Sequence, residues 1–185
     1  MMIFWLVRHG ETDWNLQGRY QGQADPPLNA HGVFQARQIG DQFRHEGITA
    51  IYSSDLQRAL HTAQVIAERL QLPVICDKRL REISLGEWEG MLTEEIIARY
   101  PQEWQRRQND PLNAHAPRGE SLSQVAERVR AAAEEIAQEY PSSSVMIVSH
   151  GMALAVLYCL AHNLPLGQAY TLIPDNAHPV KIEWM

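Results

Sequence analysis

The chain has 185 residues, a formal net charge of −6 from 16 Lys+Arg and 22 Asp+Glu, and 45% hydrophobic residues. These values exclude a disordered segment, and the net acidity argues against a nucleic-acid partner, which would require a basic surface. The length fits one domain with a large core, so residues 1–185 are expected to form a single domain. The two cysteines, Cys76 and Cys159, are too few for a disulfide-rich scaffold and lack metal-ligand spacing.

Neither of the two apolar segments that stand out has the features of a signal peptide or a membrane span. The apolar start of the chain runs directly into Arg8 and lacks a small-residue cleavage site. The run over 145–161 is interrupted by Ser149, His150 and Gly151, and it is shorter than the ~20 residues needed to cross a bilayer. We therefore expect a soluble, cytoplasmic protein with no membrane partner.

In chain order, the first expected element is a buried strand over residues 2–8, which are apolar almost throughout. A loop that contains Gly and Pro follows. Asn29 then has the position of a helix N-cap, and the helix that it starts is expected to end at Gly47 in the C′ position.

The middle of the chain alternates again between strands and helices. Residues 50–52 are expected to form a short strand, and Ser54 with Gln57 three positions later predicts a capping box for the next helix. A third strand is expected over 73–76. An irregular helical stretch that carries Trp and Arg side chains follows over 93–108.

The last third again alternates between helices and strands. Ser121 and Gln124 predict a second capping box at the start of a helix. The most apolar strand is expected over 145–149, followed by a helix at about 152–162 and a last strand near 179–184. Apolar strands that alternate with helices are typical of a mostly parallel sheet covered on both faces. The predicted fold class is therefore α/β, a three-layer α/β/α sandwich with a mostly parallel central sheet.

Basic side chains and histidines follow three of these strands at the point where each strand ends. Arg8 and His9 end the first strand, His150 follows the fourth, and Arg58 comes one turn after the second. Because the carboxyl ends of parallel strands meet at one edge of a sheet, we expect these side chains to lie close together. A single His or Arg is more often structural, but joint burial of these groups is costly unless an anion compensates them.

Two guanidinium groups and two imidazoles in one pocket indicate a phosphoryl ligand. Arginine binds phosphoryl oxygens bidentately, and one imidazole can attack phosphorus while the other donates a hydrogen bond. No metal site is expected, because Arg8 and Arg58 would repel a cation. The sequence has no Gly-x-Ser-x-Gly elbow and no Walker A loop, and neither cysteine is followed by an arginine at the spacing of a thiol phosphatase. Histidine is therefore the best candidate nucleophile.

Six segments, in order along the chain, resemble the histidine phosphatase superfamily, the phosphoglycerate-mutase-like proteins. They are LVRHGETDWN (6–15), RYQGQADPPLNAHGVFQA (19–36), SSDLQRALHTA (53–63), LREISLGEWEG (80–90), GESLSQVAERV (119–129) and VSHG (148–151). The resemblance covers nearly the whole chain and is far more specific than the Arg-His-Gly triplet alone. It implies a phosphoglycerate mutase-like fold.

The resemblance also implies a role for each matching residue. His9 is the nucleophile that becomes phosphorylated, and Glu82 is the general acid and base. The rest of the phosphate pocket is formed by Arg8, Arg58 and His150. Further phosphate or substrate contacts are implied for Asn15, Gln21, Gly22 and the backbone N–H of Gly151. On the residues alone, the favoured interpretation of Glu82 is a surface carboxylate paired with Arg79 or Arg81.

The implied cycle needs no metal and no cofactor. His9 must attack as a neutral ring, so its other nitrogen is expected to donate to a backbone carbonyl.

Superfamily membership leaves the reaction open. The mutases resembled have a His-Tyr-Gly stretch after the catalytic Glu and a long basic insertion, whereas here Ile83 follows Glu82 and only a short segment leads to Gly119. The mutases also tend to carry Asn where this chain has Met152. These departures favour a phosphomonoesterase that hydrolyses a small phosphorylated metabolite. The alternatives are mutase-type phosphotransfer and a non-catalytic domain that binds a phosphorylated ligand.

Specificity residues are expected around the leaving group. The candidates are Trp14, Arg19, Tyr20, Gln21, Trp88, and the 93–117 segment with Trp104, Arg106, Arg107 and the nearby Arg118. Trp14 and Trp88 fit loop packing equally well. An acidic rim is also expected, from Glu11, Asp13, Glu87 and Glu89.

Overall fold

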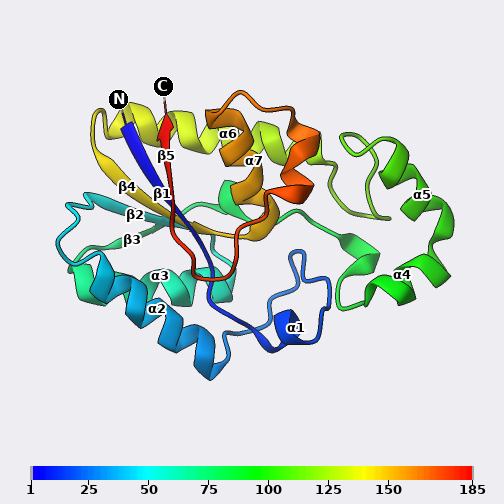
Figure 1. Cartoon of the computed structure of the whole chain (residues 1–185), viewed down its shortest axis with the longest axis horizontal. Helices are drawn as coiled ribbons and strands as arrows, with labels where there is room; N and C mark the ends of the chain where they lie inside the picture. The colour runs from blue at the N-terminus through cyan, green and yellow to red at the C-terminus, as the bar shows by residue number, and fades with distance from the viewer. Residues whose placement is uncertain (1, 185) are drawn as a thin grey trace.

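The computed structural model describes residues 2–184, and a five-stranded sheet lies at its centre (Figure 1). The strands are β1 (Met2–Arg8), β2 (Ala50–Ser53), β3 (Val74–Cys76), β4 (Ser144–Ser149) and β5 (Val180–Trp184). They are arranged in the order β3-β2-β4-β1-β5, and β5 alone runs antiparallel to its neighbour. The five predicted strands are confirmed to within one residue at each end.

Helices cover both faces of the sheet, so the predicted three-layer α/β/α architecture is confirmed (Figure 1). On one face, α2 (Ala30–Gln42) and α3 (Gln57–Leu70) pack Ile39, Phe43 and Ile66 against Val7 and Met146. On the other face lie α6 (Leu122–Glu139) and α7 (Gly151–Ala161). The side chains of one strand alternate between these two clusters, which explains why the strands are apolar throughout.

Two of the predicted helix ends are confirmed and two are wrong. Asn29 accepts the N–H of Gly32 and caps α2, and Ser121 caps α6 in a complete capping box. However, α2 ends at Gln42, earlier than predicted, so Gly47 is not its C′ residue. The predicted capping box at Ser54 is also wrong, because α3 begins at Gln57 and has Leu56 at its N-cap.

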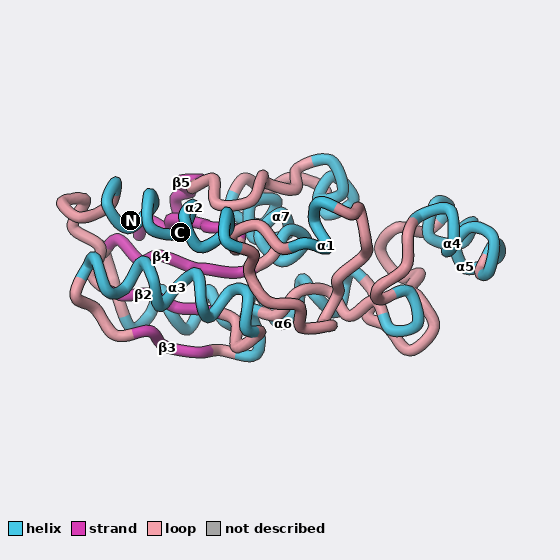
Figure 2. Tube along the Cα trace, turned by 90° about the horizontal axis from the view of Figure 1, so that it is seen from below, coloured by secondary structure: helices cyan, strands magenta, loops and turns pink. Residues whose placement is uncertain are grey.

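The segment predicted as one helical stretch over 93–108 is two helices. α4 (Thr93–Arg99) and α5 (Pro101–Asn109) are separated at Tyr100, because a proline disfavours helical geometry in the residue before it. Both helices lie away from the sheet, beyond the carboxyl ends of its strands (Figure 2). The short helix α1 (Asp13–Leu16) and 3₁₀ turns at Lys78–Leu80, Gly86–Trp88 and Leu166–Thr171 were not predicted.

Within residues 2–184, no helix has both the length and the apolar character needed to cross a bilayer.

Candidate active site

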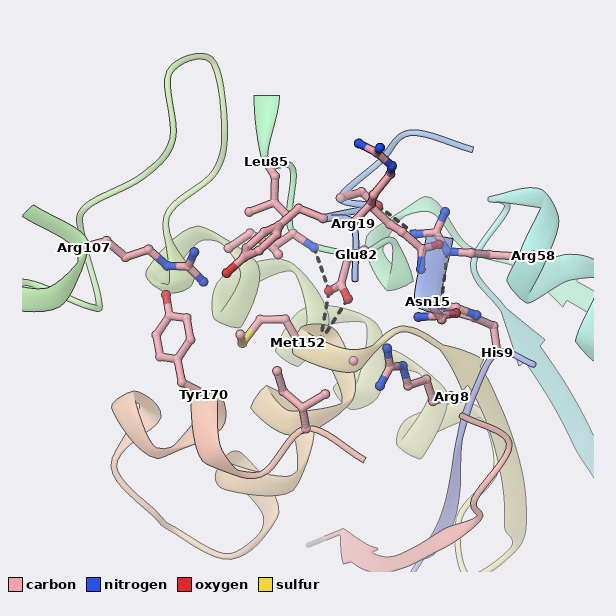
Figure 3. Close-up of a pocket in the computed structure, with 16 residues that line it drawn as sticks. Arg8, His9, Asn15, Arg19, Arg58, Glu82, Leu85, Arg107, Met152 and Tyr170 are labelled. Carbon is pink, nitrogen blue, oxygen red and sulfur yellow. Dashed lines mark hydrogen bonds between the residues drawn. The ribbon is translucent and has the colours of Figure 1, made fainter. Parts of the chain in front are cut away.

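A cavity of about 320 Å³ opens at the carboxyl ends of the parallel strands (Figure 3). The parallel register pairs Arg8 of β1 with Ser149 of β4, so the residues that follow these two strands leave the sheet side by side. Eight of the nine predicted site residues border this cavity: Arg8, His9, Asn15, Gln21, Gly22, Arg58, Glu82 and Gly151. The expectation that residues from remote segments meet at one sheet edge is confirmed.

The His9 side chain is a buried ring held in one tautomer. Its Nδ1 donates to the carbonyl oxygen of Gly10 at 2.7 Å, as predicted, and its Nε2 accepts a hydrogen bond from Nε of Arg58 at 3.2 Å. Burial and the positive charges of Arg58 and Arg8 lower the pKa of His9 well below its usual value. The ring is therefore neutral at pH 7, and the lone pair of Nε2 accepts the hydrogen bond from Arg58.

The Arg58 guanidinium is positioned by backbone carbonyls. Its Nη1 donates to the oxygen of Ala24 and its Nη2 to the oxygen of Gly22, both at 2.7 Å. Burial lowers the pKa of Arg58 to about 10, so the group still carries its charge at neutral pH. Gly22 has a positive φ of 52°, and a Cβ there would overlap the carboxylate of Glu89, so this loop requires glycine.

Arg8 is the second cation of the cavity. Its Nη1 donates to the oxygen of Pro174 at 2.9 Å, whereas its Nε is buried without a hydrogen-bond partner among residues 2–184. A Cβ on Gly151 would lie 2.8 Å from Cγ2 of Ile173, so the glycine lets Ile173 pack closely at the start of α7. Desolvation lowers the pKa of Arg8. A half-buried guanidinium whose buried Nε–H is unused favours binding of an anion.

His150 is the one predicted site residue that does not border the cavity, because its ring is fully buried beside His9. The two ring centroids are 5.3 Å apart. Nε2 of His150 lies 2.8 Å from Oγ of Ser54, which also accepts the N–H of Leu56. Nδ1 of His150 is buried without a partner in the described part of the chain. Ser54, expected to cap a helix, therefore positions a histidine of the site.

Glu82 lies at the N-terminus of α7, with both carboxylate oxygens bound to backbone N–H groups. Oε1 accepts from Ile83 at 2.9 Å, from Met152 at 3.1 Å and from Ala153 at 3.2 Å. Oε2 shares only the N–H of Met152, at 3.1 Å, and so keeps acceptor capacity for a ligand. In Figure 3 the carboxylate lies between Arg8 and Arg58 on one side and Arg107 and Tyr170 on the other.

The alternative interpretation of Glu82 as a surface carboxylate paired with a neighbouring arginine is wrong. Arg81 binds Asp55 at 2.6 Å and Arg79 binds Asp77 at 2.7 Å. Both arginines are thus paired with aspartates, and Glu82 instead borders the cavity.

Two residues that the sequence did not single out fix the nucleophile region. Asn176, in the loop before β5, donates from Nδ2 to the carbonyl oxygen of His9 at 2.8 Å. Thr62 of α3 accepts the N–H of Gly10 at 3.0 Å and donates to the carbonyl oxygen of Arg58 at 2.7 Å. Thr62 lies one helical turn after Arg58, which is the only signal in the sequence that could have pointed to it.

Asn15 and Gln21 border the cavity, and each has a polar group that can bind a ligand. Oδ1 of Asn15 accepts the backbone N–H and the hydroxyl of Thr12, each at 3.0 Å, which leaves the amide N–H groups of Asn15 for a ligand. Oε1 of Gln21 is buried without a partner among the described residues.

The predicted specificity residues divide into two groups. Those that border the cavity are Arg19, Tyr20, Gln21 and Arg107. Those that lie outside its wall are Trp14, Trp88, Trp104, Arg106 and Arg118. Trp88 is fully buried and Trp14 packs against Gly90, so both belong to the packing of loops. The predicted acidic rim is wrong for Glu89, whose carboxylate accepts the N–H groups of Gln23 and Leu85 inside the scaffold.

The two buried histidines predict a fall in stability in mild acid. Both pKa values are lower in the folded chain than the ordinary 6.5 of an unfolded one, so below pH 6.5 the unfolded state binds protons that the native state does not. The free energy of unfolding should therefore decrease as the pH falls from 7 to 5, by up to about 1.4 kcal/mol per pH unit for each ring. Urea unfolding at several pH values measures this slope. The His150→Gln variant should have a smaller slope, because it lacks the contribution of one of the two rings. A pH-independent stability over this range would contradict the prediction.

Arg8, Arg58, His9, His150 and Glu82 thus lie together at the strand ends of an α/β sheet. The chain belongs to the histidine phosphatase superfamily (branch 1), whose family model matches residues 4–185.

Several relatives are similar over most of this chain. It is 38% identical to phosphoserine phosphatase 1 of Hydrogenobacter thermophilus, over 93% of this chain and 82% of that protein. It is 41% identical to "Probable phosphoglycerate mutase GpmB" of Serratia proteamaculans, over 89% of this chain and 77% of that protein. Among solved structures, the α-ribazole phosphatase of Shigella flexneri is 28% identical with a TM-score of 0.90, over 98% of this chain and 90% of that one. A mycobacterial glucosyl-3-phosphoglycerate phosphatase, solved with VO₃, is 33% identical with a TM-score of 0.86, over 97% and 90%. The relatives are thus phosphatases and mutase-like proteins.

Proposed function

We propose that this protein is a metal-independent phosphomonoesterase that hydrolyses a small phosphorylated metabolite through a phosphohistidine on His9. The observation that carries the proposal is the state of this ring, which is neutral, fixed in one tautomer by Gly10, and borders a cavity that also holds the guanidinium groups of Arg8 and Arg58. An unprotonated imidazole keeps on Nε2 the lone pair that can attack phosphorus. Arg8 and Arg58 attract the phosphoryl oxygens and would repel a metal cation.

In the first step, Nε2 of His9 attacks phosphorus in line with the leaving oxygen. The P–N bond forms as the P–O bond breaks, and the protonated carboxyl of Glu82 transfers its proton to the leaving oxygen. Arg8 and Arg58 stabilise the charge on the equatorial oxygens. We assign the same role to His150 through its Nδ1, which has no partner among the described residues and whose ring lies beside His9. The Nδ1 proton stays on the ring, bound to the carbonyl of Gly10.

In the second step, a water molecule attacks the phosphohistidine. The Glu82 carboxylate takes a proton from this water as its oxygen bonds to phosphorus, the P–N bond breaks, and His9 returns to its neutral form. The sum is a phosphomonoester plus water giving an alcohol plus inorganic phosphate. Proton transfer of this kind contributes about 10²–10⁴-fold to a rate.

A small substrate is supported by the size of the cavity and by the relatives. A volume of about 320 Å³ lies at the lower end of the range for small-molecule sites. The names of the relatives refer to phosphoserine, phosphoglycerate, α-ribazole and glucosyl-3-phosphoglycerate compounds.

Hydrolysis of p-nitrophenyl phosphate in excess EDTA tests the proposal. The purified protein should release p-nitrophenolate and inorganic phosphate in equal amounts, and EDTA should leave the rate unchanged because Arg8 and Arg58 perform the electrostatic role that a metal would have. A rate that EDTA abolishes and Mg²⁺ or Zn²⁺ restores would contradict metal independence. Binding of inorganic phosphate without any turnover would instead indicate a non-catalytic binding domain.

Mutase-type phosphotransfer is the second candidate, because the phosphoglycerate mutase-like relative is 41% identical. A mutase should interconvert 3-phosphoglycerate and 2-phosphoglycerate in the presence of a 2,3-bisphosphoglycerate primer, with little release of inorganic phosphate. We expect the opposite balance, with release of phosphate dominating.

A further inference from the structure

Arg107 of α5 is a cation of the cavity that the phosphatase cycle does not use. Its guanidinium carbon lies over three aromatic rings, 5.5 Å from the centroid of Trp88, 6.0 Å from that of Trp104 and 4.9 Å from that of Tyr170. These contacts, which come from three separate segments, hold the side chain in one place. Arg107 therefore has a defined position although it lies on a short helix remote from the sheet.

The charge of Arg107 has no acidic partner among residues 2–184. Nη1 of Arg107 is buried and donates no hydrogen bond within that part of the chain. The neighbouring arginines differ, because Arg19 donates to the carbonyl of Gly90 and lies 3.7 Å from Glu95, while Arg118 lies 3.5 Å from Glu87. A buried donor without a partner is costly, so a ligand that accepts from Nη1 gains this free energy.

The same cavity connects Arg107 with the phosphate-binding groups. In Figure 3, Arg107 and Tyr170 lie on one side, Arg8, His9 and Arg58 lie on the other, and Glu82 lies between them. A phosphoryl group bound by Arg8 and Arg58 therefore directs its leaving group toward Arg107.

We infer that Arg107 binds a carboxylate on the leaving group, so that the substrate is a phosphorylated carboxylic acid. The inference rests on the proposed phosphatase function. A carboxylate matches one guanidinium in charge and in its two-oxygen geometry. A second phosphoryl group would need further donors, but the Tyr170 hydroxyl already donates to Pro111 and the adjacent walls are Leu85 and Met152.

The test compares 3-phosphoglycerate with glycerol 3-phosphate, which has a hydroxymethyl group in place of the carboxylate. The wild-type protein should prefer 3-phosphoglycerate in kcat/KM for phosphate release by at least about tenfold. In Arg107→Met, which keeps apolar contact with the rings, the ratio of the two kcat/KM values should fall by about 10- to 100-fold. The kcat/KM of this variant for 3-phosphoglycerate should fall mainly because its KM rises. Arg107→Lys should retain part of the preference.

Arg106→Met is the matched control, because Arg106 is the exposed neighbour of Arg107 on α5. It should leave the ratio at the wild-type value. Because each ratio is measured on one preparation, partial unfolding cancels. A ratio in Arg107→Met within about twofold of wild type, or an equal change in Arg106→Met, would overturn the inference and leave the phosphatase function standing. A wild-type protein that hydrolyses p-nitrophenyl phosphate but not 3-phosphoglycerate would also overturn it. Absence of hydrolysis of all three compounds would overturn the proposed function itself.

Discussion

Replacement of His9 by alanine should lower kcat for p-nitrophenyl phosphate by at least about 10⁴-fold, because the covalent route loses the nitrogen that bonds to phosphorus. The arginines of the cavity remain, so the variant should still bind inorganic phosphate. Steady-state kinetics together with titration of phosphate by calorimetry measure both properties. Trapping of ³²P on the wild-type protein in acid-labile form, and its absence in the variant, would identify the intermediate.

His61→Ala is the matched control for this experiment. His61 is an exposed residue of α3, and its replacement should leave kcat unchanged. Retention of more than about one tenth of the wild-type kcat in His9→Ala would exclude His9 as the nucleophile.

The Glu82→Gln variant should separate the two steps of the cycle. With an alkyl phosphate such as 3-phosphoglycerate, loss of the general acid should lower kcat by about 10²–10⁴-fold. p-Nitrophenolate leaves without a proton, so phosphorylation of His9 should stay fast while attack by water becomes slow. Rapid mixing should then show a burst of one p-nitrophenolate per protein molecule, followed by slow turnover.

The control is Glu94→Gln, since Glu94 is an exposed carboxylate of α4. It should behave like the wild type with both substrates. An equal loss on the two substrates with no burst would show that Glu82 acts in binding or folding and transfers no proton.

The strands and the inner site could be predicted from the sequence because both depend on short-range patterns. A strand buried on both faces is apolar at every position, which made 2–8 and 145–149 easy to recognise. Arg8 ends such a strand, and His9 and His150 come directly after one, so the topology of a parallel sheet was enough to bring them together.

The features that the sequence did not predict depend on contacts between remote segments. Ser54 has the local pattern of a capping box, but its hydroxyl lies against His150, and this tertiary contact overrides the local preference. Asn176 follows no strand and carries no motif. Arg107 resembles its neighbour Arg106 in the sequence, and only the stacking of Trp88, Trp104 and Tyr170 distinguishes the two.

The loop before β5 makes the site depend on a contact between remote parts of the chain. Pro174 accepts from Arg8, Asn176 donates to the backbone of His9, and the N–H of Ala177 donates to the carbonyl of Arg8. The backbone that orients the nucleophile is thus supported by a segment 167 positions further along the chain. A folding intermediate in which this loop has not yet docked leaves the carbonyl of His9 without that support, so catalytic competence should arise only in the last stage of folding.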